Sequence, residues 1–195
     1  MAGRAPRQAH NAGLHAGLAA LLRGTDWQGA AQEYRTAIQL APSDARWYAG
    51  LGTALEHGWG QLDAAVSAYQ IALRLDPESQ EAQQGLVRTL AQRARFQSDI
   101  EDLQQKAAAS PTNAQFQYGL GVARIAVGDL DGAAKSFTRA VELDPKYGRA
   151  EAQLAIVRYL RNDYAGAWDA VQKAEALNAP ADEELVRSLR VKAPR

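Results

Sequence analysis

The side chains that could do chemistry in this chain are few, and their spacing suits little of it. Histidine occurs only at His10, His15 and His57. His10 and His15 are five residues apart, whereas two histidines that bind a metal from one helix need a spacing of four. No acidic cluster completes a coordination sphere, and the absence of cysteine excludes disulfides, thiolate catalysis and cysteine-bound zinc. The sequence therefore predicts no metal site, and we expect these histidines on the surface or in a groove.

Two glycine motifs look like the beginning of a dinucleotide-binding loop. They are Gly50-Leu51-Gly52 and Gly119-Leu120-Gly121, but Leu55 and Arg124 stand where the third glycine should be. That loop also needs a preceding strand, and none is expected before either motif. We therefore expect these glycines to allow close helix packing, and the sequence predicts no cofactor.

Paired carboxylates are a second possible source of chemistry, because two acidic groups can share general acid and base roles. The pairs Glu101-Asp102 and Glu183-Glu184 are expected on solvated helix faces, where a carboxylate does little catalysis. No convergent polar site can be assembled from these residues. The sequence therefore predicts no catalytic residue, and we expect that the protein is not an enzyme.

Composition restricts the class of partner. The chain has 195 residues with 22 basic and 22 acidic side chains, which is enough for one or two domains and gives a net charge of zero. Binding of nucleic acid through bulk charge is disfavoured, because it needs a basic excess. No apolar stretch approaches the roughly 20 residues that cross a bilayer, and no signal peptide is visible. We predict a bacterial protein that is not integral to the membrane and lies in the cytoplasm, or in the periplasm if a signal peptide was removed.

The elements that position the side chains follow from a repeat. Proline recurs every 34 or 35 residues, and at four of the five sites a leucine lies two or three residues before it. An interval of this size indicates a solenoid of stacked repeats. The prolines are Pro42, Pro77, Pro111, Pro145 and Pro180.

Each interval contains two groups of residues with helical spacing. One is an apolar residue followed by a small one, and the other is a small, an aromatic and a small residue separated by four and three positions. Residues three and four apart share a helix face, and small side chains there let two helices approach closely. The groups include Leu51-Gly52 and Leu120-Gly121, then Ala30, Tyr34 and Ala37, Ala65, Tyr69 and Ala72, and Ala133, Phe137 and Ala140.

We therefore predict two helices in each interval. The first helices cover about 10–23, 44–57, 78–93, 112–126 and 146–160, and the second about 26–39, 61–74, 97–109, 130–143 and 164–177. A further helix over about 181–191 is charged on one side and apolar on the other, so it is expected to cap the stack.

The pattern resembles the tetratricopeptide repeat (TPR) family. The fourth interval carries Tyr118-Gly119-Leu120-Gly121, Gly128-Asp129-Leu130, Ala133, Phe137, Ala140 and Leu143-Asp144-Pro145. The resemblance implies an all-α fold: a right-handed α-solenoid of about five helix-turn-helix repeats plus a C-terminal capping helix. It also implies a concave groove, lined by the first helices, that binds a peptide or protein without catalysis.

This resemblance sets the expected domain boundaries. We expect a disordered lead over residues 1–9, a TPR domain over 10–180 and a capping helix with a tail over 181–195. The expected repeats are about 10–43, 44–78, 79–112, 113–146 and 147–180.

The third repeat departs from the pattern. Asp99 and Lys106 replace its small residues, Leu103 replaces its aromatic residue, and its inter-helix turn at Arg93-Ala94-Arg95 has no glycine. Three readings stay open: the repeat packs differently, it bends the superhelix, or it is a degenerate repeat that has drifted without consequence.

The expected groove is apolar at both ends and polar in the middle, and it suits a segment with apolar anchors and a few acidic groups. Its candidate residues are Leu14, Leu18, Arg46, Thr53, Gln84, Arg88, Tyr118, Val122, Arg149, Ile156 and Tyr159. The sequence thus predicts a non-catalytic interaction module that binds a peptide or protein partner. The alternative is a self-associating scaffold or spacer in a bacterial envelope, pilus or secretion assembly, a homo-oligomer held by its apolar end repeats.

Overall fold

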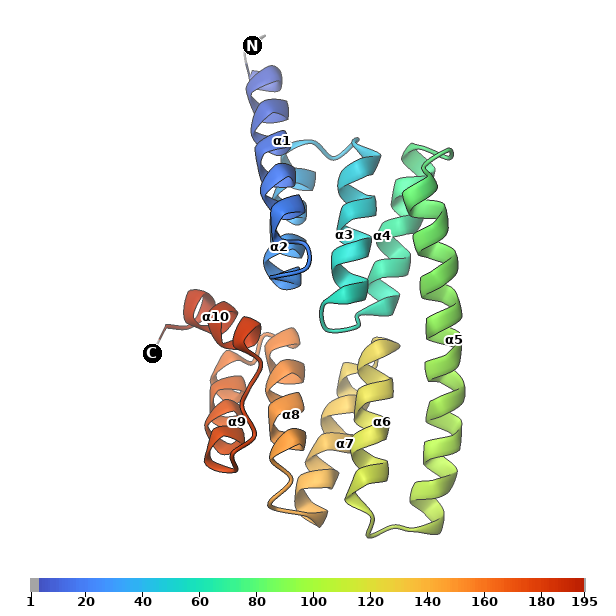
Figure 1. Ribbon diagram of the computed structural model, residues 1–195, viewed down its shortest axis with the longest axis vertical. Coiled ribbons are helices and arrows are strands. Elements are labelled where there is room, and N and C mark those ends of the chain that lie inside the picture. Colours follow the sequence, from blue (N-terminus) through green and yellow to red (C-terminus); the bar gives the residue numbers. More distant parts are fainter. Residues whose placement is uncertain (1–3, 195) are drawn as a thin grey trace. The chain divides into compact units, whose positions relative to one another are not determined.

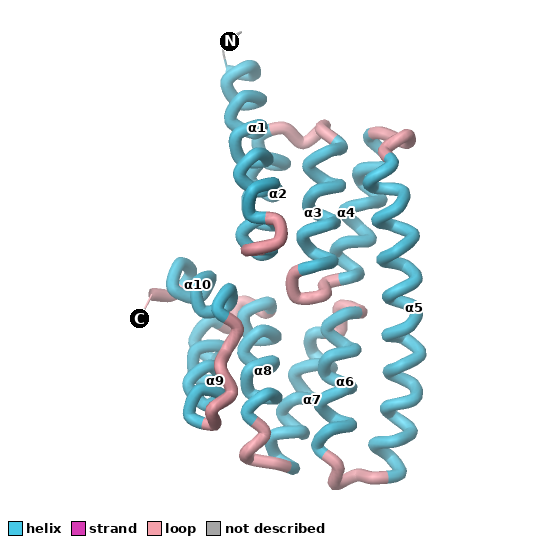
Figure 2. The backbone as a smooth tube through the Cα atoms, in the orientation of Figure 1, coloured by secondary structure: helices cyan, strands magenta, loops and turns pink. Residues whose placement is uncertain are grey.

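A computed structural model describes residues 4–194 of the chain and contains, in that range, ten α-helices and no strand (Figures 1 and 2). The helices are α1 (Arg4–Leu22), α2 (Trp27–Leu40), α3 (Ala45–His57), α4 (Leu62–Leu75), α5 (Gln80–Ala109), α6 (Ala114–Ala126), α7 (Leu130–Leu143), α8 (Gly148–Leu160), α9 (Tyr164–Ala176) and α10 (Glu183–Lys192). The predicted all-α fold is confirmed, and α10 is the expected last helix.

The chain divides into two compact units. The first is Met1–Arg93, with α1 to α4 and the first part of α5, and the second is Ala94–Arg195, with the rest of α5 and α6 to α10. Consecutive helices pair within each unit, α1 with α2 and α3 with α4 in the first, α6 with α7 and α8 with α9 in the second (Figure 1). Each unit therefore has its own core, built from the predicted helix pairs.

The structure corrects the expectation for the third repeat. Instead of two helices joined by a turn at Arg93-Ala94-Arg95, α5 is one helix of 30 residues. The other intra-repeat turns each contain a residue with positive φ: Gly24, Gly60, Gly128 and Asn162. Residues 91–98 include no glycine, asparagine, aspartate or proline, so nothing in them ends the helix.

The N-terminal end also differs from expectation. Helix α1 begins at Arg4, so residues 4–9 of the expected disordered lead are helical. The physical reason is composition, since arginine, glutamine and alanine have high helix propensity. Residues 1–3 of that expected lead lie outside the described residues.

Aspartate begins three of the second helices. The side chains of Asp26, Asp129 and Asp163 accept hydrogen bonds from the backbone N–H groups of the glycines three residues later, at 2.7, 2.8 and 3.0 Å. Each bond satisfies one of the N–H groups that a helix start leaves unpaired. The repeated Asp-x-x-Gly sequence therefore sets where α2, α7 and α9 begin.

Glycine on a first helix makes room for an aromatic ring from a second helix. A Cβ atom at Gly52 would lie 2.7 Å from Cε1 of Tyr69, and one at Gly121 would lie 2.5 Å from Cε1 of Phe137. Tyr69 and Phe137 are fully buried. The Gly-Leu-Gly motifs are therefore packing sites, as the sequence predicts.

We expect Gly52→Ala to lower the free energy of unfolding, because the new methyl group would be forced against the Tyr69 ring. Overpacking of this kind costs about 1–3 kcal/mol. Gly17→Ala is the control, since Gly17 lies inside α1 with nothing within 4 Å of its Cβ position. That change should stabilise the protein by up to about 1 kcal/mol through helix propensity. Urea unfolding measures both, and equal stability of the two variants would contradict the role given to Gly52.

Candidate functional site

Side chains of α3, α4 and α5 form a hydrogen-bonded network in the first unit. Arg88 donates from Nε and Nη2 to the two carboxylate oxygens of Glu56, at 2.7 and 2.8 Å. The Tyr69 hydroxyl donates to Oε2 of Glu56 at 3.1 Å. Thr53 Oγ1 lies 3.1 Å from that hydroxyl and donates to Oε1 of Glu81 at 3.2 Å. The network joins three helices through one buried carboxylate.

The charges of this network are matched inside the protein. Burial raises the pKa of the Glu56 carboxyl, but the hydrogen bonds and charge of Arg88 and the bond from Tyr69 outweigh burial and hold that pKa below its usual value. Burial raises the pKa of Tyr69 to about 12, so its hydroxyl stays protonated and donates. The Glu56 hydrogen bonds raise the pKa of Arg88. Arg88, a groove candidate, is therefore already ion-paired with Glu56, and this pair joins α3 to α5.

Arg46, another candidate, is also engaged. Its Nε and Nη2 donate to the Asp44 carboxylate at 3.0 and 2.7 Å, and its guanidinium lies 4.9 Å from the ring centroid of Trp47. These contacts are local to the start of α3, where Asp44 is the N-cap. In the first unit, therefore, both arginines predicted for the groove already have an acidic partner.

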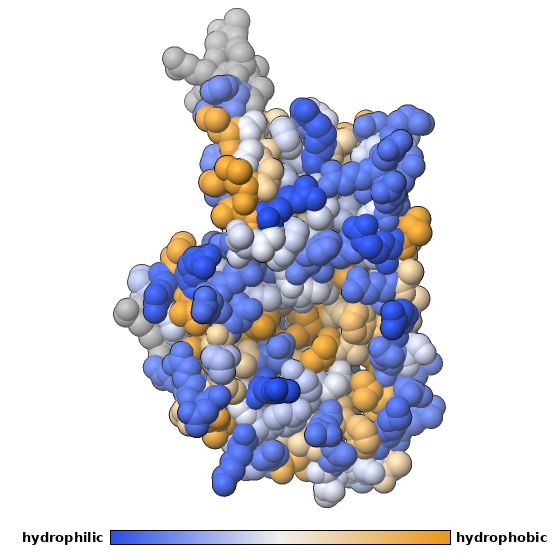
Figure 3. Space-filling view, in the orientation of Figure 1, coloured by the Kyte–Doolittle hydropathy of each residue, from blue (hydrophilic) through white to orange (hydrophobic). Residues whose placement is uncertain are grey.

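The other candidates differ in accessibility. Leu14 and Leu18 on α1 are 61% and 45% exposed, and hydrophobic side chains gather along this helix (Figure 3). Gln84 is exposed on α5. Thr53 and Ile156 are buried, so neither offers its side chain to a ligand. The half-buried candidates are Val122 on α6 and Tyr159 on α8.

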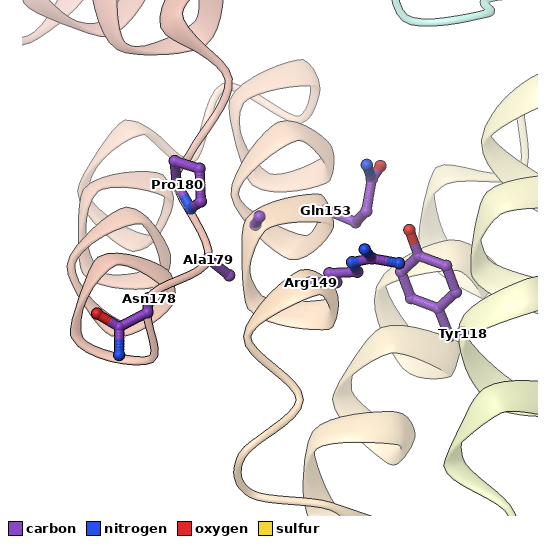
Figure 4. A pocket seen from close by; sticks show the side chains of 7 residues that line it. Tyr118, Arg149, Gln153, Asn178, Ala179 and Pro180 are labelled. Carbon is purple, nitrogen blue, oxygen red and sulfur yellow. The ribbon is translucent and has the colours of Figure 1, made fainter.

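The structure brings two predicted residues together in the second unit. Tyr118 on α6 and Arg149 on α8 line one cavity of about 510 Å³ (Figure 4). Ala152 and Gln153 of α8 and the segment 178–180 after α9 complete its lining. Gln153 could have been found from its four-residue spacing to Arg149, but nothing in the periodicity indicated that 178–180 reaches this cavity.

The Tyr118 ring is held by other rings. Its centroid lies 5.7 Å from that of Phe137 and 5.2 Å from that of Tyr147. Burial, with the neighbouring Tyr118, raises the pKa of the Tyr147 hydroxyl, which therefore stays neutral. Within residues 10–194, where side chains are described, Arg149 has no ion pair. The cavity thus combines a fixed aromatic ring with an available cation.

Other kinds of site find little support among the described residues. These residues contain no group of three histidine, cysteine, aspartate or glutamate side chains that could hold a metal ion. In the same part of the chain, no helix combines the length and the apolar character that crossing a membrane requires.

We expect Glu56→Gln to destabilise the protein by about 1–2 kcal/mol at pH 7, because it weakens charged hydrogen bonds to a half-exposed arginine. Since folding lowers the pKa of Glu56, its contribution is complete above the unfolded-state pKa of about 4.3 and is lost as pH falls through the lower folded value. The difference from the unchanged protein should therefore shrink below about pH 5. Urea unfolding between pH 7 and pH 3 measures it.

Glu175→Gln is the matched control for that experiment, because Glu175 is an exposed glutamate on α9. It should change stability by less than about 0.5 kcal/mol at any of these pH values. A Glu56→Gln effect that is independent of pH would show that the carboxylate charge does not stabilise the network.

Comparisons with known proteins agree with the repeat pattern. Models of the tetratricopeptide repeat match residues 18–58, 60–114 and 92–174. The TPR repeat-containing protein PA0015 of Pseudomonas aeruginosa is 36% identical over 80 residues, which are 41% of this chain and 76% of that protein. The CTR9 homolog of Arabidopsis thaliana is 30% identical over 108 residues, which are 55% of this chain but a tenth of that protein.

Two solved structures are similar over most of their length. MamA from Desulfovibrio magneticus RS-1 has a TM-score of 0.43 at 22% identity, covering 86% of this chain and 95% of that one. YrrB, described as a TPR protein with an unusual peptide-binding site, has a TM-score of 0.44 at 20% identity, covering 91% and 90%. From its repeats and from its match to PA0015, this chain belongs to the tetratricopeptide repeat family.

Proposed function

We propose that this protein is a non-catalytic interaction module whose second unit binds a segment of another protein. Membership of the tetratricopeptide repeat family supports an interaction module in general terms. The observation that carries the proposed site is that Tyr118 and Arg149 line one cavity, with the Arg149 charge unmatched by any described carboxylate. The bacterial origin and the compartment stay predictions from composition.

The cavity suits an acidic group next to an apolar or aromatic one. A guanidinium donates two parallel hydrogen bonds to a carboxylate, which is stronger and more directional than a contact with a neutral group. Tyrosine gives a large contact area at low entropic cost when its ring is already held, as Phe137 and Tyr147 hold Tyr118. Gln153 adds an amide that can pair with a peptide backbone, and Ala179 and Pro180 form a wall (Figure 4).

The first unit supports this function less well. Arg88 and Arg46 each have a carboxylate within 3 Å, so a ligand carboxylate would have to displace Glu56 or Asp44. Displacing Glu56 would leave a buried charge without its partner, which is costly. Arg149 is therefore the better binding partner for the carboxylate of an acidic segment.

A self-associating scaffold is the second candidate function, and the exposed leucines of α1 favour it. Leu14, Leu18 and Leu21 are 61%, 45% and 80% exposed, and their spacing of four and three places them on one face of the helix. Exposed apolar side chains grouped on one face are typical of contact sites in soluble proteins.

We expect Arg149→Glu to weaken binding of acidic peptides at least tenfold, because it replaces attraction by repulsion. The probes are 12-residue peptides with one aspartate or glutamate beside an aromatic residue, first screened as an array and then titrated by fluorescence polarisation. Raising the salt from 50 to 500 mM should also weaken binding, since the pair is partly solvated.

Arg190→Glu is the matched control, with the same change of charge at an exposed residue of α10 outside the cavity. It should alter affinity less than twofold. If both variants lose binding equally, the effect comes from net charge and not from the cavity. If the array yields no peptide that Arg149→Glu releases, the proposed site is wrong.

A further inference from the structure

The second part of α5 lacks the cover that every other second helix has. In α2, α4, α7 and α9 the three core positions are at most 4% exposed. These are Ala30, Tyr34 and Ala37, Ala65, Tyr69 and Ala72, Ala133, Phe137 and Ala140, and Ala167, Val171 and Ala174. On α5 the same positions are Asp99 and Lys106, which are exposed, and Leu103, which is half-buried.

The missing cover is a first helix. In the second repeat, Tyr69 contacts Gly52 of its own first helix and Gly85 of the next one. In the third repeat, Leu103 contacts Gly119 of the next first helix, with its Cδ atoms 3.2 Å from the Cβ position there. The residue that should pack on Leu103 from its own repeat is Val87, which is 70% exposed. Because α5 continues without a turn, Val87 lies about 24 Å from Leu103 along the helix axis, at 1.5 Å per residue, and cannot pack on it.

An open cleft marks this place in the second unit. A cavity of about 370 Å³ lies between α5 and α6. Its apolar lining includes Phe96, Leu103, Tyr118 and Val122, and Asp99, Asp102 and Lys106 also line it. Lys106 donates a hydrogen bond to Asp102 at 3.0 Å, so Asp99 is the lining carboxylate that remains open to a cation. The cleft therefore offers an apolar floor with one open carboxylate, Asp99, in the position where a first helix packs in the other repeats.

Helix α1 has the complementary surface. It packs on α2 through Ala12, Ala16 and Ala19, all nearly or fully buried. Its other face carries the exposed Leu14, Leu18 and Leu21. Gly13 and Gly17 lie on the side of α1 between the alanine face and the leucine face. Nothing lies within 4 Å of their Cβ positions, so a ring or a helix can approach closely there.

The charges of the two surfaces also match. Helix α1 contains Arg4 and Arg7 and no acidic residue. Residues 94–109 of α5 contain three acidic side chains, Asp99, Glu101 and Asp102, against Arg95 and Lys106, which gives a net charge of −1. Such complementarity favours the docking of unlike surfaces over like ones.

We propose that α1 of one copy docks into the α5–α6 cleft of a second copy, where it takes the place of the first helix that the third repeat lacks. The two surfaces differ, so the contact is head-to-tail: each chain offers one α1 and one cleft, and chains join in rows. The α1 leucines contact Phe96, Leu103 and Val122, and Asp99 places a carboxylate beside a helix that carries no acidic residue. This contact does not use Arg149, and although Tyr118 lines both cavities, the two proposals are tested by different variants.

Light scattering of the full chain between 5 and 200 µM tests the contact. The average mass should rise with concentration beyond the 21.0 kDa of one chain. Leu14→Glu on α1 and Phe96→Glu in the cleft should each hold the protein at monomer mass. Asp99→Arg, at an exposed position, gives a second cleft variant in case Phe96→Glu unfolds by circular dichroism. Val191→Glu is the control, because Val191 is 78% exposed on α10, and it should assemble as the unchanged chain does.

Mixing the two blocked variants separates this contact from others. Leu14→Glu keeps a free cleft and Asp99→Arg keeps a free α1, so a mixture should form a complex of two chains and stop there. If α1 instead paired with α1 of another copy, Asp99→Arg alone would dimerise and the mixture would gain nothing. That result would overturn the proposal, as would a chain that stays monomeric at 200 µM or an assembly that Leu14→Glu leaves intact.

Discussion

The structure depends on one contact, an aromatic ring of a second helix lying against a glycine of a first helix. Tyr34 lies over Gly50, Tyr69 over Gly52 and Gly85, and Phe137 over Gly121. A side chain at any of these glycines would push the helices apart, so the ring and the missing Cβ fix the distance between them. Where it occurs, this contact helps to turn short helices of low individual stability into a packed unit, and in α9 the buried Val171 takes the place of the ring.

The same contact explains where the stack is interrupted. In the third repeat the ring is replaced by Leu103 and the facing small residue by Val87, while Asp99 and Lys106 replace the alanines. Two helices with these residues gain little from folding back on each other. The segment between them has no residue suited to positive φ, so a continuous helix is the conformation left to it.

The regular packing of the repeats decides which helices and which site residues the sequence predicts. The proline interval and the glycine and alanine spacing predict eight of the ten described helices within a few residues at their C-terminal ends, because packing repeats regularly, and the charged and apolar sides of residues 181–191 predict α10. The repeat interval predicts a turn at Arg93-Ala94-Arg95, whereas the lack of glycine there favours the continuous helix that α5 forms. Tyr118 and Arg149 were predicted from their place on first helices, whereas 178–180 was missed because loops carry no such period. The engagement of Arg88 by Glu56 depends on rotamers that spacing alone does not determine.

The weaker coupling at Leu103 has a consequence for how stability is shared along the chain. In repeat proteins the total stability is a sum of terms from each repeat and from its nearest neighbours. Tyr69 contacts glycines of two first helices, Gly52 and Gly85, whereas Leu103 contacts Gly119 of one. The term between neighbouring repeats is therefore smaller at Leu103 than at Tyr69, and the boundary between the two compact units falls inside an unbroken helix.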